Sequence, residues 1–331
     1  MAHTPHDALF KFAFSKAEHA IGELRAVLPP ALVAQIDWDS LVLESGDLVD
    51  STLDQARSDV LWSVKLGGRS AFLYVLLEHQ STVDPLMAYR LLKYMLAIWD
   101  RWLAEHPDAK TLPVIIPVVV HHSDSGWTAA TALEQLFDIT ESVRDALGEH
   151  TLRMRFILDD VSRVDDHVLR ARPMTPFGRV VLWSLRDARD GDALLRGLAA
   201  WADLLREINR TPGGRDALFA FASYACEVLD LTVTELEEIV VTAVGDEVKN
   251  TMASTADQLR EQGRREGEAR GLREGVARGR RETLRLLLDR RFGPLSPEVE
   301  SQLANATERD LEQWTLRILD ARTLAEVLGD A

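Results

Sequence analysis

The chain has 331 residues and a formal charge of −15, because 53 acidic side chains outnumber 38 lysines and arginines. With 46% hydrophobic and 27% charged residues, its composition is globular and excludes fibrous and disordered proteins. The acidic balance argues against a protein that coats DNA by bulk charge, and the lone Cys226 excludes an intrachain disulfide. We expect a soluble, cytoplasmic protein with no membrane partner, because no signal-peptide pattern and no apolar run of membrane-spanning length is present.

The N-terminal segment predicts one amphipathic helix over residues 7–28. Apolar residues recur at helical spacing along it, Asp7 is a candidate N-cap, and Pro29-Pro30 ends the run. A capping role and a chemical role for Asp7 are both open at this point.

Two strand patterns follow, joined by a turn signal. Apolar residues at alternate positions predict a strand over Ser58–Leu66, and Gly67-Gly68 is typical of a two-residue hairpin turn. The continuous apolar run Ser70–Glu78 predicts a central strand that is buried on both faces.

A helix and a further strand then predict a parallel crossover. Apolar residues at helical spacing predict a helix over Pro85–Glu105. The apolar run Val114–His121 predicts a buried strand, in which Pro117 indicates a bulge or an edge position. Strand, helix and strand in this order favour parallel pairing. Farther along, Arg153–Leu158 predicts a short strand, and most of residues 177–250 predicts helices packed on the sheet.

Glycines recur every four residues from Gly263 to Gly279, in a segment rich in arginine and glutamate. A glycine inside a helix costs about 1 kcal/mol relative to alanine, so this period requires an explanation. The four-residue period fits either a flexible, solvated linker or a helical arm of coiled-coil type. In the second case, we expect the protein to form a homodimer through this arm. Residues 260–291 carry a net charge of +5, which leaves −20 on the rest of the chain. Glu282–Phe292 and Pro297–Leu328 predict short terminal helices.

The hairpin register predicts which polar residues share a face of the sheet. If Gly67-Gly68 form the whole turn, Asp59 lies opposite Leu76. Because side chains two apart on a strand share a face, Asp59, Glu78 and Gln80 then project to the same side. Asp59 would lie diagonal to Glu78, at roughly 7–8 Å between backbone positions. A three-residue turn would reverse this parity.

Two carboxylates on one face, Asp59 and Glu78, suit a divalent cation. Oxygen ligands with open positions favour Mg²⁺ or Mn²⁺, which keep several waters and accept substrate phosphate oxygens. The same acids also fit strand-end residues that reach solvent. Other candidates are weaker, since His121-His122 lack neighbouring ligands at zinc spacing. Asp159-Asp160 and Asp165-Asp166 fit solvated turns or caps.

A set of short motifs follows the chain from residue 5 to about residue 130. They are His6-Asp7-Ala8-Leu9-Phe10-Lys11, Arg57-Ser58-Asp59-Val60, Leu76-Leu77-Glu78-His79-Gln80-Ser81, the helix from Tyr89-Arg90 to Trp99, and residues 113–122 followed by Gly126-Trp127. In this order they resemble the recombination-promoting nuclease (Rpn)/putative transposase family. The glycine-periodic arm and Arg291-Phe292-Gly293 are similar, more loosely, to C-terminal extensions found in these proteins.

The resemblance implies an α/β fold of the PD-(D/E)XK nuclease superfamily, a restriction-endonuclease-like mixed sheet flanked by helices, with the metal-binding acids on a hairpin. Matched by motif, Asp59 is the first acid and Glu78 the second, and Asp7 would be an additional acid. Gln80 stands where the superfamily usually has lysine, although the Rpn family itself shows glutamine here. Glutamine orients water but adds no positive charge, which leaves more of the electrostatic stabilisation to the metal.

The function expected from these features is metal-dependent hydrolysis of DNA, with Asp59 and Glu78 as catalytic metal ligands for Mg²⁺ or Mn²⁺ and Gln80 positioning the attacking water. A transposase or recombination-promoting factor is an alternative of the same class. A non-catalytic DNA-binding or self-assembling protein with a degenerate nuclease fold is the alternative from another class. We expect a nuclease core at 1–165, a packed helical part at 166–250, and a helical C-terminal extension at 251–331.

Overall fold

The computed structural model describes residues 4–44, 60–78, 83–123 and 125–329, without the side chains of residues 76–78, 266, 270 and 273. The chain forms two compact units, Met1–Asp257 and Gln258–Ala331. Each unit has a hydrophobic core of its own. The finer division expected at residue 165 stays a prediction.

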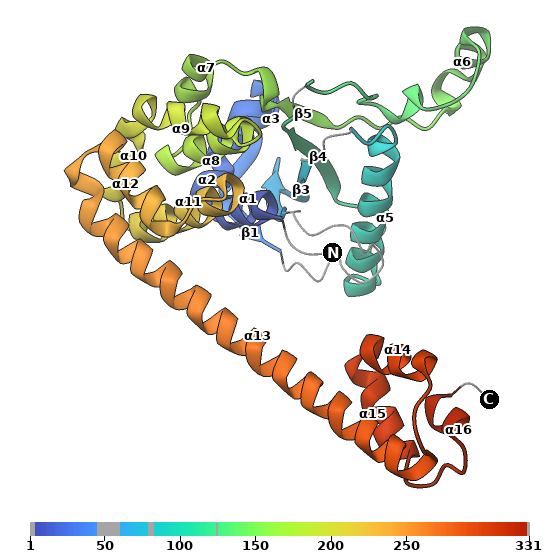
Figure 1. Ribbon diagram of the computed structural model, residues 1–331. Helices are drawn as coiled ribbons and strands as arrows, with labels where there is room; N and C mark the ends of the chain where they lie inside the picture. Colours follow the sequence, from blue (N-terminus) through green and yellow to red (C-terminus); the bar gives the residue numbers. More distant parts are fainter. Residues whose placement is uncertain (1–3, 45–59, 79–82, 124, 330–331) are drawn as a thin grey trace. The chain divides into compact units, whose positions relative to one another are not determined.

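A five-stranded mixed sheet in the order β1-β2-β3-β4-β5 forms the centre of the first unit (Figure 1). The strands are β1 (Ile36–Leu43), β2 (Val60–Leu66), β3 (Arg69–Glu78), β4 (Val114–His121) and β5 (Ile157–Asp160). β2 pairs antiparallel with both β1 and β3, whereas β3, β4 and β5 are parallel to one another. The α/β class and the mixed sheet expected from the sequence are therefore present.

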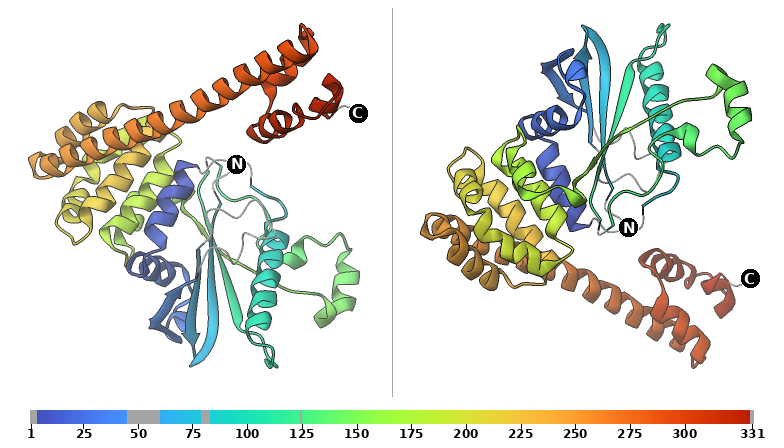
Figure 2. Two further views of the ribbon diagram at one scale, coloured as in Figure 1. Left: turned by 90° about the horizontal axis from the view of Figure 1, so that it is seen from below. Right: turned by 90° about the horizontal axis from the view of Figure 1, so that it is seen from above.

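Helices cover both faces of this sheet (Figure 2). The helices of the first unit are α1 (Pro5–Phe14), α2 (Ala17–Val27), α3 (Pro30–Val33), α5 (Met87–Glu105), α6 (Glu141–Leu147), α7 (Asp166–Ala171), α8 (Pro176–Asp187), α9 (Gly191–Ala200), α10 (Ala202–Asn209), α11 (Gly214–Leu229), α12 (Val233–Val244) and the start of α13 (Lys249–Phe292). On one face, α5 buries Leu91 and Tyr94 against Tyr74 and Val119 of the sheet. On the other face lie α1, α2 and α8.

The hairpin between β2 and β3 confirms the register predicted from its turn. Leu66 lies opposite Arg69, and the regular pairing continues to Val60 opposite Val75. Gly67 and Gly68 have φ values of 55° and 79°, which only glycine adopts readily at both positions of such a turn. The turn therefore has two residues, as the parity argument requires.

The helix predicted over residues 7–28 is wrong in two respects. The chain breaks at Ser15 and Lys16, so that α1 and α2 are separate helices. The N-cap of α1 is Thr4, whose hydroxyl accepts the Asp7 N–H at 3.2 Å, and Asp7 is the third helical residue of this capping box. The sequence did not reveal the break, because the buried positions on either side of it keep one helical spacing.

The crossover expected from strand, helix and strand is confirmed by β3, α5 and β4. Pro117 lies opposite Tyr74 in an unbroken ladder, so there is no bulge at that position. Because β5 pairs with β4 only from Val118 onward, Pro117 has a neighbouring strand on one side alone. A proline is tolerated at such a local edge because no ladder hydrogen bond is lost there.

The second unit consists of the main length of α13 with α14 (Pro297–Asn305), α15 (Glu308–Arg317) and α16 (Leu324–Leu328). Leu284 and Leu288 of α13 are buried in a small core against Leu303 and Leu311. The short helix expected over Glu282–Phe292 is thus the end of one 44-residue helix that includes the five periodic glycines. Among the described residues, no single helix is long and apolar enough to cross a membrane; only the bent pair of α11 and α12 has the length and composition.

Candidate functional site

Of the three residues predicted to carry chemistry, the structure fixes the backbone of one. Glu78 is the last residue of β3 and lies opposite His121, the last residue of β4. Asp59 and Gln80 lie outside the described residues, as does the side chain of Glu78. The placement of these three side chains on one face therefore stays a prediction, and its premise, the hairpin register, is confirmed.

The carboxyl ends of the three parallel strands form a row at one edge of the sheet. His121 lies opposite both Glu78 on β3 and Asp160 on β5. The His121 ring is buried, its Nε2 is 2.9 Å from the Ser123 hydroxyl, and it contacts the Trp127 ring edge-on at 5.0 Å. In open α/β sheets ligands bind at the carboxyl ends of the strands, so this edge is the natural place for a site.

Hydrogen bonds join the two segments that follow β4 and β5. Asp160 accepts the Trp127 N–H at 2.8 Å with one carboxylate oxygen and the Ser162 N–H at 3.2 Å with the other. The Ser162 hydroxyl accepts the Ser123 N–H at 2.8 Å, and the Arg163 guanidinium donates to the Ser125 carbonyl. These hydrogen bonds tie described residues after β4 to Asp160 and the residues that follow it.

The amino end of α1 lies beside the end of β4 on the opposite face from α5. The His6 ring contacts the His122 ring with 5.2 Å between centroids, and its Nδ1 is 3.0 Å from the Tyr224 hydroxyl. Burial raises the pKa of Tyr224 well above its usual value, so this phenol stays protonated. Asp7 is buried here, where its carboxylate completes the capping box of α1. Its role as an additional acid of the site stays a prediction.

A buried charge cluster joins β5 to α2 and to the residue that ends α7, and the sequence interpretation missed it. Arg172 binds Asp159 through two hydrogen bonds of 2.7 Å and Glu23 through one of 3.1 Å. Burial raises the pKa of Glu23 well above its usual value, and the neighbouring Asp159 raises it further. Burial thus favours the protonated, neutral form of Glu23. The expectation that Asp159 lies in a solvated turn is wrong, because Asp159 is on β5 and is buried.

Asp160, Asp165 and Asp166 are less buried than Asp159. Asp160 caps the turn after β5, as a capping role requires, and Asp166 forms an ion pair with Arg186. Asp165 precedes α7 as its N-cap residue and is exposed. Within the described part of the chain, no group of three or more His, Cys, Asp or Glu side chains is arranged to hold a metal ion.

Comparison with known proteins places this arrangement in a family. Residues 4–215 match the family model described as "Putative transposase, YhgA-like". The chain belongs to this family. The matched residues include the whole sheet and the helices on both of its faces, up to the start of α11.

The curated relatives are each similar to about a third of the chain. Recombination-promoting nuclease RpnD of Escherichia coli O157:H7 is 42% identical over 119 residues, which are 36% of this chain and 45% of that protein. Recombination-promoting nuclease RpnA of Escherichia coli K12 is 40% identical over 121 residues, which are 36% of this chain and 40% of that protein. The chain thus spans less than half the length of these two relatives.

A third relative carries a different description. The "Putative inactive recombination-promoting nuclease-like protein YjiP" of Escherichia coli K12 is 44% identical over 95 residues, 29% of this chain and 92% of that protein. The family thus includes proteins named as nucleases and a protein named as inactive, so similarity alone does not decide activity. No solved structure matches the chain.

Proposed function

We propose that the protein is a metal-dependent DNA endonuclease of the recombination-promoting nuclease type, with a PD-(D/E)XK-like core. The observation that carries the proposal is the two-residue Gly67-Gly68 turn, because its register is the one that gives Asp59 and Glu78 a common face. Relatives named recombination-promoting nuclease support the same reading. The mixed sheet with this hairpin agrees with the core expected for that superfamily.

In the proposed mechanism, Asp59 and Glu78 hold Mg²⁺ or Mn²⁺ through carboxylate oxygens, the donor type that these cations prefer. When bound, such a cation supplies a Lewis acid that lowers the pKa of a coordinated water and offsets charge on the phosphate. Gln80 orients the attacking water through its amide group. The hydrogen-bonded residues Ser123, Ser162 and Arg163 position the DNA backbone, and a well-placed reactant lowers the barrier without new chemistry.

The test is cleavage of supercoiled plasmid DNA in Mg²⁺ and in Mn²⁺, with EDTA as the metal-free control. We expect Asp59→Asn and Glu78→Gln each to lower the rate about 100-fold or more, since a catalytic metal contributes several kcal/mol. Asp39→Asn, a change of the same kind at an exposed position of β1, should leave the rate unchanged. Cleavage by both site variants at the wild-type rate would show that the assignment is wrong.

A specific observation favours the non-catalytic alternative as well, because two similar proteins are named as inactive. A protein that binds DNA in EDTA but does not cut it in either metal would support that alternative. Cleavage that disappears in Asp59→Asn would exclude it. The two readings therefore separate in a single set of assays.

We also propose that the protein is a homodimer through the part of α13 in the second unit. A Cβ atom added at any of the five periodic glycines, from Gly263 to Gly279, would meet open space. Leu272 and Val276 on the same segment are exposed, and Arg264 pairs with Glu261 at 2.7 Å along the helix. An isolated helix with five glycines is poorly stable in water, so a partner helix is the simplest source of its stability.

A further inference from the structure

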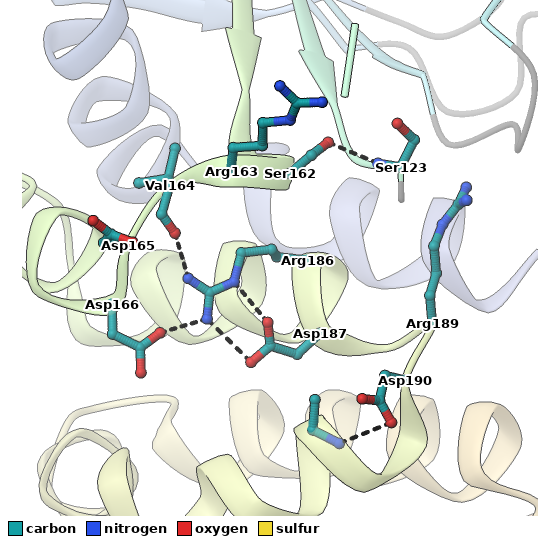
Figure 3. Close-up of a pocket in the computed structure, with 11 residues that line it drawn as sticks. Ser123, Ser162, Arg163, Val164, Asp165, Asp166, Arg186, Asp187, Arg189 and Asp190 are labelled. Carbon is teal, nitrogen blue, oxygen red and sulfur yellow. Dashed lines mark hydrogen bonds and ion pairs between the residues drawn. The ribbon is translucent and has the colours of Figure 1, made fainter. Parts of the chain in front are cut away.

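A polar pocket lies next to the row of strand ends. It has a volume of about 480 Å³ and is bounded by the segments after β4 and β5 and by the end of α8 and start of α9 (Figure 3). At its upper end in Figure 3 lie Ser123, Ser162, Arg163 and Arg189, with the two serines between the two guanidinium groups. Ser123 follows His121 by two residues, so this end adjoins the predicted catalytic edge.

In the lower part of the pocket, the charged side chains form ion pairs with one another or with neighbouring residues. Arg186 donates to Asp187 at 2.6 Å and also pairs with Asp166 (Figure 3). Asp190 caps α9 and pairs with Arg196 at 3.3 Å. Two arginines thus face three aspartates, so this part of the pocket has an excess of negative charge and does not attract an anion.

The upper end is different, because Arg163, one of its two arginines, has a neutral partner. Arg163 donates to the backbone carbonyl of Ser125, and no ion pair joins it to a carboxylate among the described residues. Asp160, the last residue of β5, accepts two backbone N–H groups instead. The exposed Asp165 lies at the far end of the pocket from Ser123 in Figure 3. The guanidinium charge of Arg163 is therefore available to an incoming anion.

The two serines provide donors of fixed position. Because the Ser162 hydroxyl oxygen already accepts the Ser123 N–H at 2.8 Å, its own O–H is left to donate outward. The Ser123 hydroxyl lies 2.9 Å from the buried His121, which fixes its orientation. A hydroxyl donor next to a guanidinium matches the two terminal oxygens of a phosphodiester.

We propose that the upper end of this pocket binds a DNA phosphate that flanks the cleaved bond. Arg163 supplies the charge, Ser162 donates a hydrogen bond, and the hydrogen bonds within the two segments fix both groups. This inference rests on the proposed function, since it names the part of the substrate that the same edge of the sheet holds. A free phosphate ion offers the same oxygens, but only a DNA strand also reaches the row that contains Glu78 and His121.

The experiment measures binding of a fluorescein-labelled 20-base-pair DNA duplex by anisotropy in EDTA, where metal-dependent cleavage does not occur. Wild type is compared with Arg163→Ala and Arg163→Lys at several salt concentrations. Arg153→Ala is the matched control, because Arg153 is also exposed and donates to a backbone carbonyl, that of Gly148. Thermal unfolding of each variant shows that the fold is retained.

We expect Arg163→Ala to weaken binding about fivefold to tenfold and to lower the salt slope by about 0.9, the value for one phosphate contact on B-form DNA. Arg163→Lys should keep most of the slope, and Arg153→Ala should resemble wild type. Equal effects of the two alanine variants, or no binding by wild type, would overturn the inference. Competition by millimolar inorganic phosphate as strong as that by unlabelled duplex would show an ion site and overturn it too.

The failure of this inference and that of the proposed function are distinguishable. Weaker binding by Arg163→Ala, together with no cleavage in any metal, would support the phosphate site and reject the nuclease. Cleavage that depends on Asp59, together with unchanged binding by Arg163→Ala, would support the nuclease and reject the phosphate site.

Discussion

The buried cluster of Glu23, Arg172 and Asp159 predicts a measurable dependence of stability on pH. The side chains of Glu23, Arg172 and Asp159 are only 2%, 11% and 8% exposed, so solvent screens their interactions weakly. Two carboxyl groups share one guanidinium, and burial raises the pKa of Glu23 well above its ordinary value of 4.5. The perturbation that isolates this effect is Glu23→Gln, which keeps the shape and makes the group neutral at every pH.

The sign follows from proton linkage. Because the folded protein holds the Glu23 proton more tightly than the unfolded chain, the stability from the neutral acid is fully present below about pH 4.5. It is lost as the pH rises toward the raised pKa, at about 1.4 kcal/mol for each pH unit between the two values. The glutamine variant has no such loss. Its free energy of unfolding should match that of wild type near pH 4.5 and exceed it increasingly above that pH.

The assay is urea unfolding at pH 5, 6, 7 and 8, followed by tryptophan fluorescence. Seven of the eight tryptophans lie in the first unit, so the signal reports on the unit that contains the cluster. Glu18→Gln on the same helix is the control, because the Glu18 side chain is 68% exposed. A difference between Glu23→Gln and wild type that stays constant from pH 5 to pH 8 would refute the reasoning.

Arg172→Met should instead lower the free energy of unfolding by about 3–5 kcal/mol, because it leaves buried Asp159 without its cation.

Two further predictions concern the second unit. Leu288→Ala should lower the stability of that unit by about 2–5 kcal/mol, since Leu288 is fully buried, whereas the exposed neighbour Leu286→Ala should change it by less than about 0.5 kcal/mol. Thermal unfolding by circular dichroism measures both, and equal effects would contradict the packing of this core. Gly275→Ala with Gly279→Ala should raise helicity, at about 1 kcal/mol per site, but raise the dissociation constant of the proposed homodimer. Analytical ultracentrifugation decides, and an unchanged dissociation constant would exclude the glycine stripe from the interface.

Local chemistry decided the parts of the fold that the sequence predicted well. Gly67-Gly68 leaves few options for the hairpin turn, and the register of both strands follows from it. The apolar spacing of α5 and the apolar run of β4 likewise gave both elements nearly their observed bounds. By contrast, apolar and polar residues alternate in β1 only over Ile36–Asp39, which is too short to predict a strand, and the break at Ser15 leaves no trace in the spacing.

The cluster around Arg172 was beyond prediction for a different reason. Its partners Glu23 and Asp159 are 149 and 13 residues away along the chain, and no local pattern marks a residue whose partner is supplied by tertiary structure. Asp159 and Asp160 are adjacent in sequence, yet Asp159 binds a buried arginine and Asp160 binds two backbone N–H groups. Strand alternation on β5, a period of two, separates their roles.

The net charge of −15 therefore says little about the electrostatics of the candidate site. Two carboxylates near the strand ends form ion pairs with arginines, Asp159 with Arg172 and Asp166 with Arg186. A matched carboxylate contributes little to the potential that an incoming strand of DNA meets, because its field is cancelled within a few ångströms. Arg163 donates to a neutral backbone carbonyl, so its charge contributes more to this potential. An acidic protein can thus present a local cationic group to a phosphate, and the salt slope of DNA binding measures it directly.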